Sequence, residues 1–294
     1  GQQMKSFNSK RCYKSFAFFI TLMCSHVALA EKIKIEKLDE LPRYTYKIDI
    51  NAVELYSDDK KLAELTKQVK KDLLSDLDRY EITDKTTLQG YYSNLGSIAI
   101  IENDWSKYLE YLNLRKELEA KESNRLTAGL IGQAVAEAKL KGGDDFATVF
   151  KDSYSKIIAG LPYEVVQDAL KSSKGGTEII SNNLIMGLIN ERIQPQLDKS
   201  NGEMSESTAR GLLGRVFTFK YFIPLKDIIN EELSRVIAAN DIVKEDIWAV
   251  RDQELKQGEG KEAVTLAVWD SGVDTVIFNK SNQMWINNAE IPNN

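Results

Sequence analysis

The segment SDDKKLAELTKQVKKDLLSDL, residues 57–77, has the clearest periodicity in the chain. Its apolar residues recur at steps of three and four, with lysines and aspartates between them: Leu62, Leu65, Val69, Leu73 and Leu77. This spacing places the apolar side chains on one face of a helix. Ser57-Asp58-Asp59 supplies an N-cap and acidic residues for the first turn. The segment therefore predicts an amphipathic helix.

The residues just before this helix have a different period. In Arg43–Ile50 the apolar side chains alternate strictly with polar ones, so that Tyr44, Tyr46, Ile48 and Ile50 share one face. Alternation with a period of two is typical of a half-buried strand. We therefore expect one strand before the helical region.

A pair of helices is predicted over residues 88–118, with a break and a new cap at Asn103-Asp104 and a second helix that begins at Trp105. Tyr92, Leu95-Gly96 and Ala99, followed by Leu112, weakly resemble a tetratricopeptide helix pair. Such repeats need about three copies to be stable, and no second copy follows at that period. Helical hairpins of no particular family are therefore the favoured interpretation.

Helical patterning continues to about residue 240, and its interruptions divide it into segments. The expected breaks are at Gly142-Gly143, Gly160-Leu161-Pro162, Gly175-Gly176, Pro195, Lys199–Gly202 and Pro224. Leu126–Leu140 is expected to be one helix, and the charged residues along all helices are expected to face solvent. Residues 57–240 thus predict a mainly α architecture of antiparallel helical hairpins.

The composition argues against a strongly basic nucleic-acid-binding protein and contains few histidines and cysteines for catalysis or metal binding. Hydrophobic residues make up 43% and charged residues 28%, and the net charge is −5. This balance is typical of a globular protein and gives no electrostatic basis for nucleic-acid binding. His26 is the single histidine, and Cys12 and Cys24 are the two cysteines.

The N-terminal 30 residues have the pattern of a secretory signal peptide. Four basic residues precede the apolar run Phe16–Cys24, and Ala28-Leu29-Ala30 offers a small-residue cleavage site. The apolar run is too short to span a bilayer. Cleavage after Ala30 would remove His26 and both cysteines, so we expect an exported protein, secreted or periplasmic, without a histidine base, a disulfide or stable membrane insertion.

A change of composition follows residue 255. Residues 256–262 predict a glycine-rich linker, and Ala263–Trp269 is a continuous apolar run typical of a strand buried on both faces. The run ends in Asp270-Ser271-Gly272-Val273-Asp274. An acid beside a glycine turn at the carboxyl end of a parallel strand is a common position for functional groups in α/β enzymes.

These residues resemble the aspartate motif of subtilases, the subtilisin-like serine peptidases, in which an apolar strand is followed by Asp-(Ser/Thr)-Gly-(Ile/Val)-(Asp/Asn). Met284–Asn287 and Glu290–Pro292 are similar to a further segment of many secreted members. The resemblance covers residues 263–294, and Trp269 is bulkier than the usual aliphatic residue. It implies that Asp270 is the catalytic aspartate and that Asp274 supports the turn.

The resemblance further implies a secreted endopeptidase with an Asp-His-Ser triad that acts on protein or peptide substrates. The triad needs no cofactor, and the family allows calcium, although no calcium site is identifiable in this sequence. The histidine and serine motifs are not among these residues, so we expect an inactive N-terminal fragment that begins a truncated α/β subtilisin-like domain.

The expected organisation is a signal peptide at 1–30, a mostly helical region at 31–255, a linker at 256–262 and the start of the peptidase domain at 263–294. The helical region is expected to be either an accessory region or a propeptide, and to contact the catalytic domain within the chain. Typical subtilase propeptides are shorter and mixed α/β, which favours an accessory region. The alternative is a secreted helical interaction domain without enzymatic activity.

Overall fold

The periodic segment after Ser57 forms helix α1, Asp59–Arg79, in a computed structural model that describes residues 31–240. Asp58 is the N-cap, and its carboxylate accepts hydrogen bonds from the backbone N–H groups of Lys60 and Lys61. The predicted apolar face is buried, with Leu62, Leu65, Val69 and Leu73 at most 3% exposed. The helix and its buried face are therefore confirmed.

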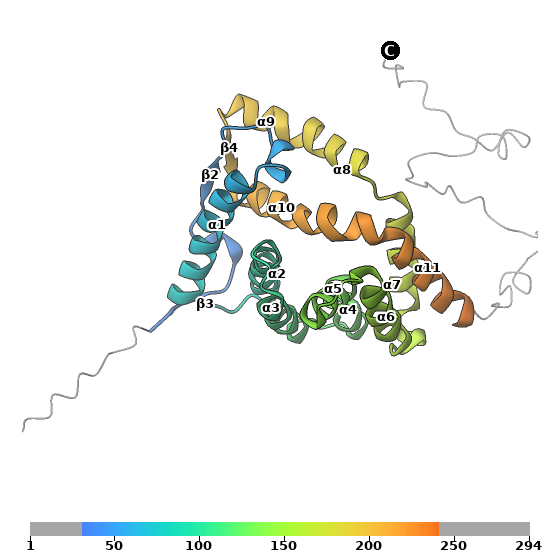
Figure 1. Cartoon of the computed structure of the whole chain (residues 1–294). Coiled ribbons are helices and arrows are strands. Elements are labelled where there is room, and N and C mark those ends of the chain that lie inside the picture. The colour runs from blue at the N-terminus through green and yellow to red at the C-terminus, as the bar shows by residue number, and fades with distance from the viewer. Residues whose placement is uncertain (1–30, 241–294) are drawn as a thin grey trace, which may run out of the picture. The chain divides into compact units, whose positions relative to one another are not determined.

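The described residues are mainly helical, and short strands accompany the first and ninth α-helices (Figure 1). The strands are β1 Ile33–Ile35, β2 Thr45–Lys47, β3 Tyr80–Ile82 and β4 Glu203–Ser205. The remaining α-helices are α2 Lys85–Ile101, α3 Trp105–Glu117, α4 Glu122–Thr127, α5 Leu130–Lys141, α6 Phe146–Ala159, α7 Tyr163–Ile179, α8 Asn182–Leu188, α9 Gln194–Lys199, α10 Glu206–Phe217 and α11 Ile223–Asn240. Two 3-10 turns, η1 Leu38–Glu40 and η2 Glu54–Tyr56, precede α1, and two π-helical turns, η3 Ile189–Ile193 and η4 Thr218–Phe222, lie within the last helices.

The alternating segment 43–50 contains β2, which is shorter than predicted. Tyr46 and Ile48 are buried, whereas Thr45 and Lys47 are exposed, so the predicted face is confirmed. Strand β2 pairs antiparallel with β4, with Tyr46 opposite Met204. A second small sheet pairs β1 parallel with β3. We did not predict β1, β3 or β4, because three residues are too few to show a period.

Consecutive helices joined by short loops pack against each other, α2 with α3 and α5 with α6. Asp104 caps α3 through its side chain, as expected, and Asp145 caps α6 in the same way. Helix α10 packs on α2, and α11 packs on α6 and α7. This arrangement closes the hairpins into one body, because the last long helical stretch contacts both the first and the later helices.

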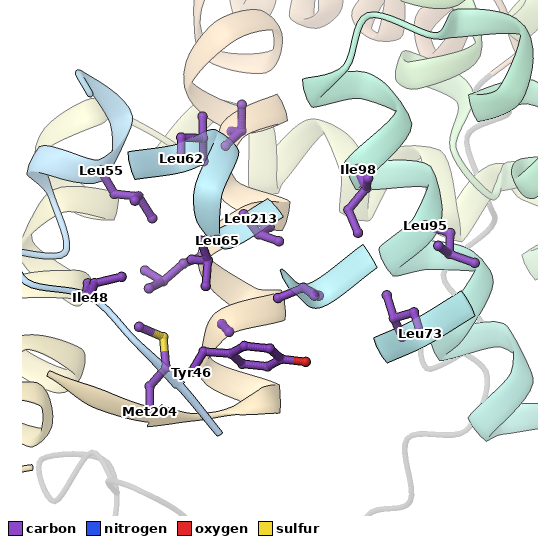
Figure 2. Packing of buried hydrophobic residues seen from close by; sticks show 14 of the residues in the cluster. Tyr46, Ile48, Leu55, Leu62, Leu65, Leu73, Leu95, Ile98, Met204 and Leu213 are labelled. Carbon is purple, nitrogen blue, oxygen red and sulfur yellow. The ribbon is translucent and has the colours of Figure 1, made fainter. Parts of the chain in front are cut away.

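Two hydrophobic cores lie within this body. The first joins α1, β2, β4 and α10, as Figure 2 shows for Tyr46, Leu65, Leu73, Met204 and Leu213. The second is built from α3, α5, α6, α7 and α11. Helix α2 contributes to both, with Leu95 and Ile98 in the first core and Ala99 and Ile100 in the second. The two cores are therefore joined by α2, which contributes to both, and by the continuous helical stretch from α10, in the first core, to α11, in the second.

Three of the predicted helix ends are wrong. Helix α7 continues through Gly175 and Gly176 to Ile179, because its apolar face packs on α11 and outweighs the weak helix propensity of glycine. Helix also continues past Pro195 and Pro224. Leu126–Leu140 is two helices rather than one, because Gly129 has a left-handed φ of 66°.

Each of these two prolines lies two residues after the end of a π-helical turn. The N–H of Gln194 donates to the carbonyl of Ile189, and the N–H of Ile223 donates to that of Thr218, each five residues earlier. Proline has no N–H and its ring clashes with the carbonyl four residues before it. A π turn widens the helix just before the ring, so the helix passes Pro195 and Pro224 without breaking.

Candidate functional site

The sequence-predicted site residue lies outside the described residues. Asp270 and Asp274 belong to the segment after residue 240, as do the predicted linker 256–262 and the strand 263–269, and His26 belongs to the segment before residue 31. The catalytic assignment of Asp270 therefore stays a prediction. Two other groups of polar side chains within residues 31–240 were not predicted from the sequence.

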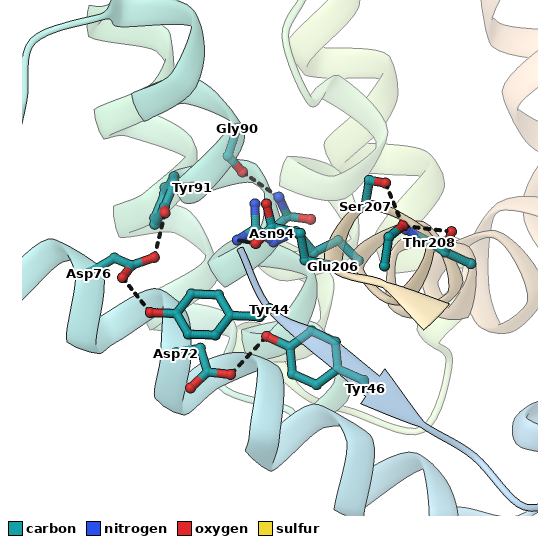
Figure 3. Close-up of polar contacts among 12 residues, drawn as sticks. Tyr44, Tyr46, Asp72, Asp76, Gly90, Tyr91, Asn94, Glu206, Ser207 and Thr208 are labelled. Carbon is teal, nitrogen blue, oxygen red and sulfur yellow. Dashed lines mark hydrogen bonds and ion pairs between the residues drawn. The ribbon is translucent and has the colours of Figure 1, made fainter. Parts of the chain in front are cut away.

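The first group is a tyrosine–carboxylate cluster between β2, α1 and α2 (Figure 3). Asp76 is fully buried, and its two carboxylate oxygens accept hydrogen bonds from the hydroxyls of Tyr44, at 2.7 Å, and Tyr91, at 2.6 Å. Tyr46 donates to Asp72, one helical turn away, at 2.9 Å. Burial, and then the hydrogen bond to a carboxylate, raises the pKa of all three tyrosines far above the ordinary value. The phenols are therefore hydrogen-bond donors at neutral pH.

Arg210 of α10 completes this cluster. Its guanidinium lies over the ring of Tyr91, 5.1 Å from the ring centroid, and forms an ion pair with Glu206 at 3.1 Å. The Nε atom of Arg210 is buried and has no hydrogen-bond partner among the described residues. The cluster contains donors, acceptors and one cation but no nucleophile, so its chemistry suits holding β2 and α10 against α1 and α2.

The burial of Asp76 corrects the expectation that charged side chains along the helices face solvent. Glu232 on α11 is likewise only 3% exposed, and it pairs with Arg235 at 2.7 Å. Buried carboxylates are tolerated when hydrogen bonds or charges satisfy them. The four-residue spacing of Asp72 and Asp76 opposite two alternating tyrosines was the signal in the sequence that could have indicated the cluster.

The second group lines a cavity of about 380 Å³ among the helices of the second core. Residues one turn apart on α2, namely Ser93, Gly96, Ser97 and Ile100, form one wall. Tyr108, Tyr111, Leu112 and Arg115 of α3 form another, because positions three, four and seven residues apart share a helix face. Further lining residues include Leu170 and Ser173 of α7 and Gly214 and Phe217 of α10. Its size is within the range of ligand-binding pockets.

Glycines give Tyr108 its place in the cavity wall. A Cβ atom at Gly132 would lie 1.9 Å from the Tyr108 hydroxyl oxygen, and one at Gly129 would lie 3.4 Å from it. Tyr108 is 9% exposed. Burial raises the pKa of its hydroxyl to about 12, although the charge of Arg115 opposes that rise. The hydroxyl is therefore protonated at neutral pH, and it has no hydrogen-bond partner among the described residues.

Arg115 is the one charged side chain among the residues that line this cavity. It is half-buried and forms no ion pair or hydrogen bond with any residue of the described range 31–240. Its neighbour Lys116 donates to the Gln133 side chain at 3.1 Å, and burial followed by the charge of Arg115 lowers the pKa of Lys116. The cavity thus has mostly apolar and hydroxyl-bearing walls with a single cation.

Between residues 31 and 240 no three acidic, histidine or cysteine side chains gather where they could hold a metal ion. The calcium expectation concerns a domain outside this range and stays a prediction. No helix within the same range combines the length and apolar character that crossing a membrane requires.

The comparisons with known proteins add no relative to this description. The two resemblances, to a tetratricopeptide pair near Tyr92 and to a subtilase motif at Asp270, therefore have only the sequence motifs as their basis. No family model, no curated protein and no solved structure matches this chain.

Proposed function

We propose that this chain is the exported N-terminal part of a subtilisin-like serine endopeptidase, in which residues 31–240 form a helical accessory body. The observation that carries the proposal is the apolar run 263–269 followed directly by Asp270-Ser271-Gly272-Val273-Asp274. In an Asp-His-Ser triad the aspartate accepts a hydrogen bond from the histidine, fixes its tautomer and stabilises the imidazolium that forms when the serine loses its proton. Asp270 would have this role, and protein or peptide would be the substrate.

The proposal makes the helical body an accessory region rather than a removed propeptide. Residues 31–240 contain two hydrophobic cores and belong to a compact unit that ends at Asp241. A segment with cores of its own can stay folded after peptide-bond cleavage elsewhere in the chain. Such a body suits positioning or recruitment better than transient inhibition.

The catalytic part of the proposal is tested with the complete gene product, in which a histidine motif and a serine motif should follow residue 294. Asp270→Asn is nearly isosteric, so the protein should fold normally, and kcat should fall by roughly ten-thousandfold because the amide favours the wrong histidine tautomer. Asp274→Asn is the matched control, and its effect should be far smaller. Equal losses in both variants, or activity of Asp270→Asn within about tenfold of the parent, would show that the aspartate is misassigned.

The fate of the helical body is tested by determining the N-terminus of the mature exported product. A mature chain that begins at Glu31 supports a retained accessory body. A mature chain that begins near Lys261 would mean that the helical region is a removed propeptide.

A second candidate function is a secreted helical binding domain without enzymatic activity. The observation that favours it is the cavity within residues 31–240, which needs no residue after Asn240 for its walls. A coding sequence that contains no histidine or serine motif after residue 294 would support this candidate and would exclude the peptidase.

A further inference from the structure

The cavity between α2, α3, α7 and α10 has its one lining cation, Arg115, on the same wall as Tyr108. Tyr108 and Arg115 are seven residues apart on α3, so their side chains lie on the same helix face. Both line the cavity, and neither side chain has a hydrogen-bond partner among residues 31–240.

From this arrangement we infer that the cavity binds a small organic acid, with its carboxylate at Arg115 and its apolar body inside. A guanidinium fits a carboxylate in a planar, two-point geometry. A partly desolvated cation without a counter-ion is unfavourable, so a bound anion restores the balance of charge. One lining cation matches one negative charge, which favours a monocarboxylate over a phosphate dianion.

The rest of the cavity suits an apolar ligand body. Its walls include the side chains of Ile100, Leu112, Leu130, Leu170, Phe217 and Phe222. Gly96 and Gly214 face the same space and leave room that a larger residue would fill. A ligand with one aromatic ring and a short acidic chain has the size and polarity that such a pocket accepts.

The test is isothermal titration calorimetry of the full chain with phenylpropionate and with phenylpropanol, which share a skeleton and differ in charge. Phenylpropionate should bind at least about tenfold more tightly, because the carboxylate gains charge-assisted hydrogen bonds. Phenylpropylamine should bind more weakly than either, because its ammonium repels Arg115. Sodium chloride should weaken the binding of phenylpropionate and leave that of phenylpropanol nearly unchanged.

Two variants locate the site. Arg115→Gln keeps a polar side chain but removes the charge, so it should lower the affinity for phenylpropionate to that of phenylpropanol. Arg192→Gln is the matched control, because Arg192 is exposed and does not line the cavity, and it should bind like the parent. Circular dichroism and urea midpoints of both variants check that they fold.

The space itself is tested at Gly214. Gly214 lines the cavity, and a Cβ atom there overlaps nothing, because its nearest neighbour is the Ser97 hydroxyl oxygen at 3.9 Å. The side chain of Gly214→Leu should therefore occupy part of the cavity. Binding of both phenylpropionate and phenylpropanol should be lost. Gly187→Leu on α8, where no atom lies within 4 Å of the new Cβ, is the control.

Three results would overturn the inference: equal affinities for phenylpropionate and phenylpropanol, unchanged affinity in Arg115→Gln, or no binding of phenylpropionate at millimolar concentration. These outcomes are independent of the peptidase proposal, because none of the variants touches Asp270.

Discussion

Tyr91 donates a hydrogen bond of 2.6 Å to Asp76, and it thereby fixes α2 to a carboxylate that is fully buried on α1. Tyr44 satisfies the other carboxylate oxygen from the segment that leads into β2. The segment before β2, helix α1 and helix α2 are therefore joined by hydrogen bonds at the carboxylate of Asp76. Asp76 depends on both phenols, because a buried carboxylate without hydrogen-bond donors is strongly unfavourable.

Tyr91→Phe should lower the free energy of unfolding by about 1.5–3 kcal/mol, because it removes one hydrogen bond to a buried charge and keeps the ring. Urea denaturation followed by circular dichroism measures the change. Tyr92→Phe is the control, because Tyr92 is half-buried and its hydroxyl has no partner among the described residues. Equal midpoints for the two variants would mean that Asp76 does not need the Tyr91 hydroxyl.

Stability should decrease at alkaline pH. Burial raises the pKa of Tyr108 from 10 to about 12 and that of Tyr91 still further, so both stay protonated in the folded state. Above about pH 10 the unfolded chain loses these protons and the folded chain does not, which favours unfolding by about 1.4 kcal/mol per pH unit for each such tyrosine. The contribution of these protonated tyrosines to the folding stability is complete below pH 10 and is lost as the pH rises through their folded-state pKa.

This alkaline effect is measured by urea midpoints at increasing pH, together with the absorbance of tyrosinate in the folded and unfolded protein. Tyr108→Phe removes one contributor, so its slope against pH should be smaller than that of the parent. A midpoint that does not change between pH 10 and pH 12 would contradict the raised pKa values.

Gly132→Ala should destabilise the protein by about 1–3 kcal/mol, because the added methyl group overlaps the buried hydroxyl end of the rigid Tyr108 side chain. Gly175→Ala on α7 has the opposite expectation. No atom lies within 4 Å of the new Cβ, and alanine is a better helix former than glycine. The free energy of unfolding of this variant should therefore rise by about 0.5–1 kcal/mol. Thermal or urea unfolding of the two variants compares the signs directly, and the same sign in both would contradict the packing at Tyr108.

The two cores should unfold together. Of the four tryptophans only Trp105 lies within residues 31–240, and it belongs to the second core, whereas Leu73 is fully buried in the first. In residues 31–240 produced alone, Leu73→Ala should lower the free energy of unfolding by about 2–5 kcal/mol. The unfolding transition followed by Trp105 fluorescence should shift as much as the transition followed by circular dichroism. Leu74→Ala, at a residue that is 40% exposed, is the control. A Trp105 transition that stays in place would show that the cores unfold separately.

The sequence predicted those elements whose signals are local. These are the apolar stripe of α1, the cap at Asp104 and the alternating face of Tyr46, which depend on neighbours within one or two turns. The short strands could not be predicted, because β1 and β4 are defined by partners about 47 and 158 residues away along the chain. Backbone pairing over such distances leaves little trace in a three-residue segment.

The candidate sites show the same limit. Asp72 and Asp76 look like solvated residues until Tyr44 and Tyr46 are placed opposite them, and Arg115 looks like an ordinary helix-end cation until α2 and α7 enclose it. The motif at Asp270 is contiguous in the sequence, so it was visible without a fold. A site assembled from several helices is visible only when their packing is known.

The π turn before Pro224 sets the rotation of α11 about the helix axis relative to α10. An α-helix turns by about 100° per residue, so the one extra residue held in Thr218–Phe222 turns α11 by that angle relative to an uninterrupted continuation of α10. With this offset the stripe of α10 that holds Leu212 and the stripe of α11 that holds Ile229 each face their own core. A one-residue deletion at this point would leave both helices intact and would direct the second stripe away from the residues that it covers.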